Sequence, residues 1–288
     1  MPSSEFLPIV ICLFSAITVA TVNVIVKRGG DILTGRMIVS VVMALTVVPF
    51  VPFFPMPPPS TLPLIAVSMV SHWMYQFCLV RAMHRGDLSL VYPVMRGLGP
   101  LATAIFGTFL LSEHLAPLQS IGLFCASFSI LFFALPTAAT IEGRRLDRTA
   151  LVWAALTAVG VGLYAVNDTR AARAMPHPMT FIIILFLIDW VGVTLVFLWQ
   201  RRGQYMKTLR PQLRPGIWGG IAGSLSYGAA IFAYTMTDAA MVTALRETSV
   251  VFAAVMAAVF LKESFGARRI VAASVLATGL VLMQAGAV

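Results

Sequence analysis

Apolar positions dominate the chain in long runs, which only glycine, proline and a few charged residues interrupt. A helix needs about 20 mainly apolar residues to cross the hydrocarbon core of a bilayer. Runs of this length predict ten spanning helices. Their expected bounds are residues 6–26, 32–54, 61–84, 88–111, 116–136, 149–168, 178–200, 216–236, 239–261 and 267–286. The proline-rich run at 54–59 cannot be helical, so it predicts the turn between the second and third spans.

Composition indicates a chain held in lipid. Of its 288 residues, 59% are hydrophobic and 11% are charged, whereas a soluble domain carries about 25% charged residues. The net charge of +9 would suggest nucleic-acid binding in a soluble protein, but the Lys and Arg side chains lie mostly in short connecting loops. Membrane topology and anionic lipid therefore explain the charge, and we expect the lipid bilayer, not nucleic acid, as a partner.

The distribution of Lys and Arg also predicts the orientation of the chain. Basic residues follow the first, third, fifth, seventh and ninth spans, whereas the loops on the other side hold only Arg170 and Arg173. Basic loops remain in the cytoplasm. Both termini should therefore face the outside of a bacterial-type cytoplasmic membrane.

An internal repeat relates the two halves of the chain. Three pairs of identical residues are separated by 150 positions: Arg96 and Arg246, Leu111 and Leu261, and Glu113 and Glu263. Each half then holds five spans, residues 1–138 and 149–288, joined by a linker at 139–148. Because five is odd, the second half enters the membrane from the opposite face. The sequence therefore predicts an all-α integral membrane protein with an inverted repeat, an architecture of many secondary transporters.

The repeated motifs resemble those of the EamA-type transporters of the drug/metabolite transporter superfamily. The first copy reads RGDLSLVYPVMRG at 85–97 and LLSE at 110–113, and the second reads TDAAMVTALRETS at 237–249 and LKE at 261–263. The glycine that usually precedes the glutamate is Ser112 in one copy and Lys262 in the other. The resemblance implies ten helices around a central cavity and alternating-access movement of a small metabolite, often export. It does not name the substrate.

Arg96 is the first candidate for contact with a substrate. An ionised side chain at the middle of the bilayer costs about 2.5–3.5 kcal/mol even on lenient scales. Arg96 lies about 9 residues into its span, or some 13 Å from the nearer end, which is far for the side chain to reach the headgroups. Tyr92 shares its helical face, and Pro93 and Pro100 should bend the helix there. Arg96 either contacts substrate or braces the bundle through carbonyls or Glu247.

The second copy places Arg246 and Glu247 at the equivalent position. Two arginines near one pseudo-twofold axis repel each other unless an anion lies between them. Glu247 can supply that anion, and so can a substrate carboxylate or phosphate, because guanidinium groups bind either through paired hydrogen bonds. The sequence leaves a structural pair and an anion site equally open.

Further polar residues fall inside predicted spans. Asp189 should either pair with a base, such as Arg36 or Arg246, or bind a proton, so Asp189 and Glu247 are the candidates for proton or ion coupling. Helical spacing puts the side chains of His72, Tyr75 and Gln76 in the third span on one face. The predicted cavity-lining residues are His72, Tyr75, Gln76, Trp190 and Tyr227. Four residues near span ends are expected to reach the headgroups: Arg81, His84, Glu113 and Glu263. The two glutamates can also cap neighbouring helices.

Other classes of function find less support in the sequence. The three cysteines are far apart, the four histidines are scattered, and neither set forms a metal or catalytic motif. We therefore expect no metal, no cofactor and no enzyme activity. The predicted function is a secondary transporter that exports a small zwitterionic or anionic metabolite, such as an amino acid. A membrane-embedded enzyme and a channel are the alternatives, and a monomer is compatible with the sequence.

Overall fold

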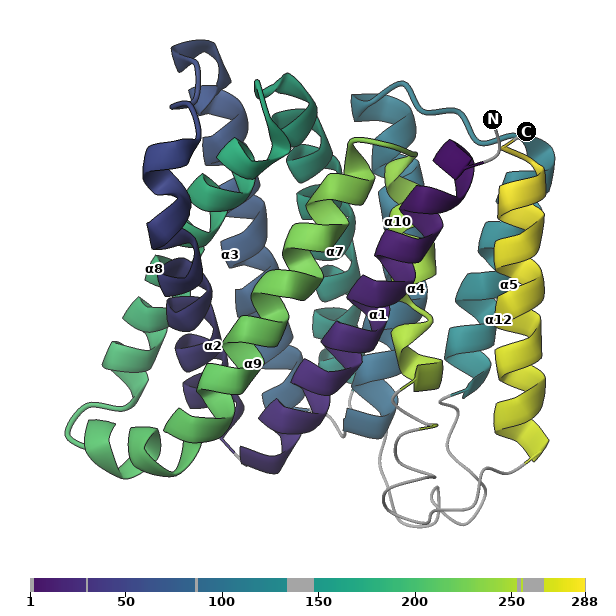
Figure 1. Cartoon of the computed structure of the whole chain (residues 1–288). Helices are drawn as coiled ribbons and strands as arrows, with labels where there is room; N and C mark the ends of the chain where they lie inside the picture. The colour runs from purple at the N-terminus through teal and green to yellow at the C-terminus, as the bar shows by residue number, and fades with distance from the viewer. Residues whose placement is uncertain are drawn as a thin grey trace. The chain divides into compact units, whose positions relative to one another are not determined.

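The computed structural model describes residues 3–29, 31–85, 88–133, 148–252, 255 and 267–287. In these ranges the chain forms helices and no strand (Figure 1). The helices are α1 (Ser3–Gly29), α2 (Ile32–Val47), η1 (Val48–Phe53), η2 (Pro59–Thr61), α3 (Leu62–Arg85), α4 (Leu88–Leu110), α5 (Pro117–Phe133), α7 (Arg148–Ala174), α8 (Pro178–Gln200), α9 (Tyr205–Tyr234), α10 (Ala239–Arg246) and α12 (Ala267–Ala285). Lys262, Glu263 and linker residues 139–147 lie outside the described residues.

Several of these helices are long and apolar enough to cross a membrane. Within the described ranges the four longest such segments are Ile32–Phe53, Pro59–Arg85, Arg148–Ala174 and Pro178–Gln200. Shorter apolar helices cover Phe6–Val22, Val94–Leu110, Pro117–Phe132 and Ile270–Ala285. The chain is therefore an all-helical, multi-pass integral membrane protein, while the count of ten spans and the inverted repeat stay predictions.

Two helices extend beyond their predicted ends. The basic segment at 201–215 was expected as a loop, but α9 already begins at Tyr205 and continues through Pro211 and Pro215. The sixth span was expected to end at Asp168, yet α7 runs on to Ala174. Its last six residues read TRAARA, and alanine and arginine are strong helix formers, so two basic residues do not end the helix.

The chain forms two compact units, each assembled from separate stretches of sequence. Unit 1 contains Met1–Trp73 and Asn167–Thr237, and unit 2 contains Met74–Val166 and Asp238–Val288. Helices α3 and α7 each contribute one part to both units. Each unit thus draws on both predicted repeats. The repeat boundaries concern sequence symmetry rather than compactness, so they stay a prediction.

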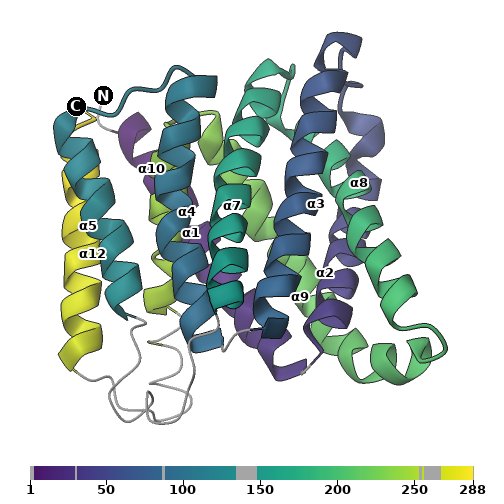
Figure 2. The same ribbon diagram turned by 180° about the vertical axis from the view of Figure 1, so that it is seen from behind.

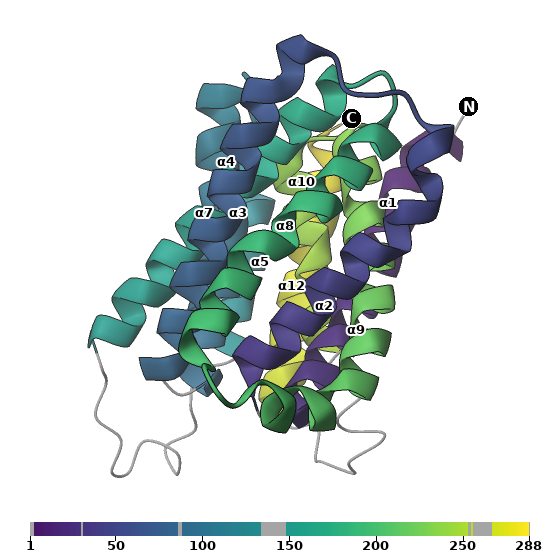
Figure 3. The same cartoon turned by 90° about the vertical axis from the view of Figure 1, so that its left-hand side faces the viewer.

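Unit 1 is held together by small residues and hydroxyl groups between its helices. Helix α9 packs along α1 and α2 (Figures 1 and 3). The Ser15 hydroxyl donates to the Ser226 carbonyl over 2.7 Å, and the Ser226 hydroxyl returns a bond of 2.8 Å to the Ser15 carbonyl. On the side toward α2, a Cβ at Gly220 would lie 2.4 Å from Cβ of Val42. Such close backbone approach is how helices pack in lipid, where burial of apolar surface contributes little.

Unit 2 uses the same device where α5 and α12 run side by side (Figure 2). A Cβ at Gly122 would lie 2.4 Å from the Gly279 carbonyl oxygen, and a Cβ at Gly279 would lie 2.6 Å from the Gly122 oxygen. The Ser129 hydroxyl donates to the Ala272 carbonyl over 2.5 Å at the same interface. Helix α4 packs against α5 and α10.

Candidate functional site

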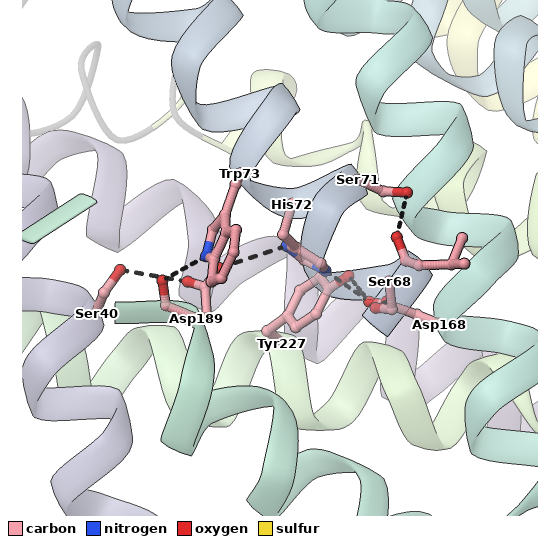
Figure 4. A network of polar contacts seen from close by, with 9 residues as sticks. Ser40, Ser68, Ser71, His72, Trp73, Asp168, Asp189 and Tyr227 are labelled. Atoms are coloured by element: carbon pink, nitrogen blue, oxygen red, sulfur yellow. Dashed lines mark hydrogen bonds and ion pairs between the residues drawn. The ribbon is translucent and has the colours of Figure 1, made fainter. Parts of the chain in front are cut away.

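Unit 1 holds a fully buried carboxylate, Asp168, on α7. Its Oδ1 accepts a hydrogen bond from the Ser68 hydroxyl of α3. Its Oδ2 accepts one of 2.9 Å from Nε2 of His72 and one of 2.5 Å from the Tyr227 hydroxyl of α9 (Figure 4). Burying a charge in an apolar bundle is costly unless it is paired and hydrogen-bonded, and three donors meet that requirement here.

His72 lies between this carboxylate and a second one. Its Nδ1 is 3.9 Å from Oδ1 of Asp189 on α8, and the other oxygen of Asp189 accepts a hydrogen bond of 3.5 Å from Ser40 of α2. The indole of Trp73 donates to the Asp189 carbonyl over 3.3 Å. A Cβ at Gly192 would lie 2.6 Å from Cδ1 of Trp73, so only glycine allows α8 this close. We call these residues the His72 cluster.

The position of the His72 cluster along its helices places it deep in the spans. Asp189 is the middle residue of α8, about 16 Å from either end at 1.5 Å per residue. His72 lies about 15 Å from the start of α3. Asp168 is about 9 Å from the end of α7. The three ionisable groups thus occupy a range of depths between the middle of the spans and one of their ends.

Unit 2 holds a second buried ion pair, which we call the Arg96 cluster. Nε of Arg96 on α4 is 3.1 Å from Oε2 of Glu247, and Nη2 donates to the Ser249 hydroxyl over 2.5 Å. The side chain of Arg96 is 20% exposed and that of Glu247 only 3%. Arg246 is also buried, and its charge acts on the Glu247 carboxylate as that of Arg96 does. The structure therefore contains the ion pair that was one of the two predicted arrangements.

The ninth predicted span is interrupted at this cluster. Helix α10 ends at Arg246, residues 247–248 form a turn, and helix resumes at Ser249. The Glu247 N–H donates to the Ala244 carbonyl, a bond to the third residue back instead of the fourth. Helix α4, in contrast, continues from Leu88 to Leu110 through both of its prolines. The bend predicted near Arg96 stays a prediction, while the interruption at 247–248 lies in the ninth predicted span.

The remaining candidates have varied surroundings. Tyr75 stacks edge-on against Tyr164, with ring centroids 5.1 Å apart, and Gln76 is buried. Trp190 follows Asp189 in sequence, but its indole donates to the Leu187 carbonyl of its own helix over 2.9 Å. The side chain of Tyr92 lies outside the described residues.

Sequence reasoning missed two members of these clusters, Asp168 and Ser249. Asp168 was taken as the end of a span, because two arginines follow closely. The helix continues for six more residues to Ala174, so Asp168 lies inside it and not at its end. Ser249 lies just after the turn at 247–248 and accepts its hydrogen bond from Arg96 of another helix, a contact that sequence spacing does not give.

Polar groups near the helix ends serve the fold. The Glu113 carboxylate accepts a hydrogen bond of 2.9 Å from the Ala239 N–H at the start of α10, so the predicted capping role is confirmed. Arg201 makes two hydrogen bonds of 3.0 Å to the Asp31 carboxylate. Burial alone would raise the pKa of Asp31, but the hydrogen bonds from Arg201 and Thr34 and the charge of Arg201 leave it below its ordinary value.

No metal centre is formed by the part of the chain that the structure describes: no three His, Cys, Asp or Glu side chains there are grouped to hold an ion. In the His72 cluster, His72 instead meets Asp168 through a hydrogen bond and Asp189 as an ion pair, and both carboxylates accept hydrogen bonds from hydroxyls. What the cluster can do chemically is hold and move a proton.

Apolar spanning helices with ion pairs buried among them define a multi-pass membrane protein with a polar interior. The model of the EamA-like transporter family matches residues 148–284, the second half of the chain. The chain belongs to the EamA-type transporters of the drug/metabolite transporter superfamily, as its motifs implied. It is therefore a membrane transporter.

A solved structure, described as "Crystal structure of protein", is similar over 96% of this chain and 95% of its own, with a TM-score of 0.71. The two sequences are 16% identical, so the similarity concerns the fold alone. Among curated proteins, none matches this sequence.

Proposed function

We propose that this transporter is a secondary carrier that exports a small zwitterionic or anionic metabolite, such as an amino acid. The observation that carries the proposal is the buried Arg96–Glu247 pair beside the interruption at 247–248. Transporters commonly bind substrate where a spanning helix is discontinuous, because unwound backbone there offers polar groups to a ligand. An ionised residue inside a span is by default a candidate for function.

The charges of the Arg96 cluster favour some substrates over others. Arg96 and Arg246 both act on the Glu247 carboxylate, and both would repel a purely cationic solute. A substrate carboxylate can replace Glu247 as the partner of Arg96, through paired hydrogen bonds. Glu247 then needs a new partner, since an unpaired buried charge is strongly destabilising. The ammonium group of an amino acid supplies that partner, so a zwitterion provides a partner for both Arg96 and Glu247.

Alternating access completes the proposal. The two inverted repeats, residues 1–138 and 149–288, would surround a central cavity and expose it to each side of a bacterial cytoplasmic membrane in turn. Both termini would lie outside by the positive-inside rule. Tyr75 and Gln76 would contact the substrate in unit 2, and the same role is proposed for Tyr92, His72, Trp190 and Tyr227. Glu247 and Asp189 would serve in proton or ion coupling.

Transport by purified protein in liposomes tests this function directly. Vesicles are loaded with one unlabelled amino acid or organic acid at a time, and entry of the labelled solute by exchange is measured. Arg96→Ala should abolish exchange and Arg96→Lys should weaken it, because lysine keeps the charge but cannot form paired hydrogen bonds. Arg81→Ala is the matched control. Arg81 is an exposed arginine on α3, which lies over the ring of Phe77 at 5.1 Å, and its loss should leave exchange unchanged.

The outcomes separate the candidate classes. Saturable exchange that Arg96→Ala removes, with the variant still inserted in the vesicles, supports the carrier. Normal exchange by Arg96→Ala refutes the site. A broad panel in which no solute exchanges refutes the carrier, and ohmic current across a planar bilayer would identify a channel instead.

A further inference from the structure

When Asp168 is ionised, the hydrogen bonds around it determine which nitrogen of neutral His72 carries the proton. A carboxylate only accepts hydrogen bonds. The three groups that meet Asp168 must therefore donate: the hydroxyls of Ser68 and Tyr227, and Nε2 of His72. A neutral imidazole carries its proton on one nitrogen only. With the proton on Nε2, the nitrogen that can take up a second proton is Nδ1, which faces Oδ1 of Asp189 at 3.9 Å.

We propose that His72 is the proton-binding residue that couples this transporter to the proton gradient, with Asp168 and Asp189 stabilising its charged form. The inference rests on the proposed carrier function and goes beyond it in naming the coupling ion and a relay that includes Asp168. Histidine suits the task, because it is the side chain whose ordinary ionisation falls in the physiological pH range. Chains of Asp, Glu and His inside spanning helices are a recurrent way to move protons.

Side-chain exposure differs along the relay. The side chain of Asp189 is 16% exposed and that of His72 10%, whereas that of Asp168 is fully buried. A proton carried by the Asp189 carboxyl group passes to Nδ1 of His72: an N–H bond forms as the O–H bond of Asp189 breaks. Asp189 returns to its carboxylate, and the imidazolium then has a carboxylate against each of its nitrogens.

The groups that face His72 from each neighbouring helix favour its positive charge. Helix α7 contributes Asp168, α8 contributes Asp189, and α9 contributes Tyr227, whose ring lies edge-on to the imidazole at 5.7 Å between centroids. Helix α2 contributes the neutral Ser40, with the cation Arg36 one turn before it. The charged residues of α1 lie only near its ends: Glu5, Lys27 and Arg28. Two carboxylates, Asp168 and Asp189, thus face the imidazole ring, against the nearby cation Arg36.

A purely structural role is the competing explanation. Asp168 would then only tie α3, α7 and α9 together, and His72 would keep one charge state. Removal of the cluster would lower stability in both cases. The discriminating measurements are therefore the charge state of the ring and the dependence of transport on a proton gradient.

Nuclear magnetic resonance of 15N-labelled histidine measures the charge state without any substrate. The chain has four histidines, and the signals absent from His72→Gln identify those of His72. These signals should change from the imidazolium to the neutral form between about pH 5 and pH 9. In Asp168→Asn the neutral fraction should be larger at any pH in that range. Signals that stay in one form throughout overturn the proposal.

Transport of the labelled amino acids and organic acids in proteoliposomes then tests coupling. For one proton per solute, an imposed difference of about 1 pH unit can drive up to about tenfold accumulation. The wild type should show accumulation that a protonophore abolishes. In His72→Gln the gradient-driven accumulation should be lost, while exchange at equal pH should fall less, and the matched control His84→Gln, exposed near the end of α3, should keep both.

The two proposals fail in different ways. A wild type that exchanges a solute but ignores the pH gradient overturns coupling and leaves the carrier standing. A wild type that moves no solute of the panel overturns the carrier itself. Retained gradient-driven accumulation in His72→Gln overturns the assignment to His72, whatever the effect of Asp168→Asn.

Discussion

Replacement of Gly122 by alanine should destabilise unit 2, and the structure gives the size of the effect. The added Cβ would lie 2.4 Å from the Gly279 oxygen and 2.7 Å from the Met283 nitrogen. Both are backbone atoms, so no side chain can rotate away, and α5 must move from α12 by roughly 1 Å. A gap of 0.5–1 Å forfeits roughly a quarter to a half of the dispersion energy at each contact.

The expected loss follows from two opposing terms. Overpacking of a well-packed interior costs about 1–3 kcal/mol. Alanine returns up to about 1 kcal/mol, because it is a better helix former than glycine. The net loss in the free energy of unfolding should be about 1–2 kcal/mol.

A matched glycine provides the control for this variant. Gly228 lies inside α9, and a Cβ there meets no atom within 4 Å. Gly228→Ala should therefore be neutral or slightly stabilising. Unfolding of the purified proteins in mixed micelles, followed by circular dichroism during a denaturing-detergent titration, measures both. Equal stability of the two variants would refute the packing argument. Gly122→Ala and Gly279→Ala widen the same contact between α5 and α12, so the double variant should lose less stability than the sum of the two single losses. Additive losses would also refute the argument.

Three further variants test single contacts by the same unfolding assay. Asp168→Ala should cost about 3–5 kcal/mol, because it leaves three buried donors without their acceptor, whereas a loss below that of Asp168→Asn would contradict the hydrogen-bond geometry. Glu113→Ala should cost about 1–2 kcal/mol through the lost cap on α10, and Glu113→Gln, which keeps an acceptor, should recover most of it. Because the pKa of Asp31 is lowered in the fold, its carboxylate adds stability above the ordinary value of 3.8, and this is lost as the pH falls through the lowered pKa. Asp31→Asn should cost only about 0.5–1 kcal/mol at pH 7, because solvent screens the partly exposed pair with Arg201. The variant should also lose this acid dependence of stability. If the acid dependence persists in Asp31→Asn, another group is responsible for it.

Hydrophobic runs predicted most helices well, because proline and charge end them sharply. Helix α8 has the predicted bounds, Pro178–Gln200: proline is favoured in the first turn of a helix, and two arginines follow its end. The same rule misplaced the start of α9, because its first turns are basic and contain two prolines. A helix there can lie at the membrane surface with polar side chains in water, so loss of hydrophobicity does not mark its boundary.

The clusters could be predicted only in part, because their contacts join distant segments. The internal repeat brought Arg96 together with Arg246 and its neighbour Glu247, and helical spacing put His72 on the polar face of its span. No rule of spacing tells that Asp168, 96 residues after His72, meets its ring. That contact depends on how α3 and α7 pack. A single sequence does not fix this packing, because in lipid it is set by small residues and hydrogen bonds between helices.

Stability alone gives no reason for either buried cluster. The charges of a buried ion pair lose their hydration, and apolar residues of similar volume are often as stable or more so. Asp168 and Glu247 are nevertheless fully enclosed, each with a basic partner on another segment. Each basic partner can respond to a ligand. A substrate carboxylate can replace Glu247 at Arg96, and a proton can change the charge of His72. A proton-coupled carrier needs two such groups, one for its solute and one for its driving ion. In the two proposals the Arg96 cluster serves the solute and the His72 cluster the proton; the clusters belong to separate units, so one can be disabled by mutation while the other is measured.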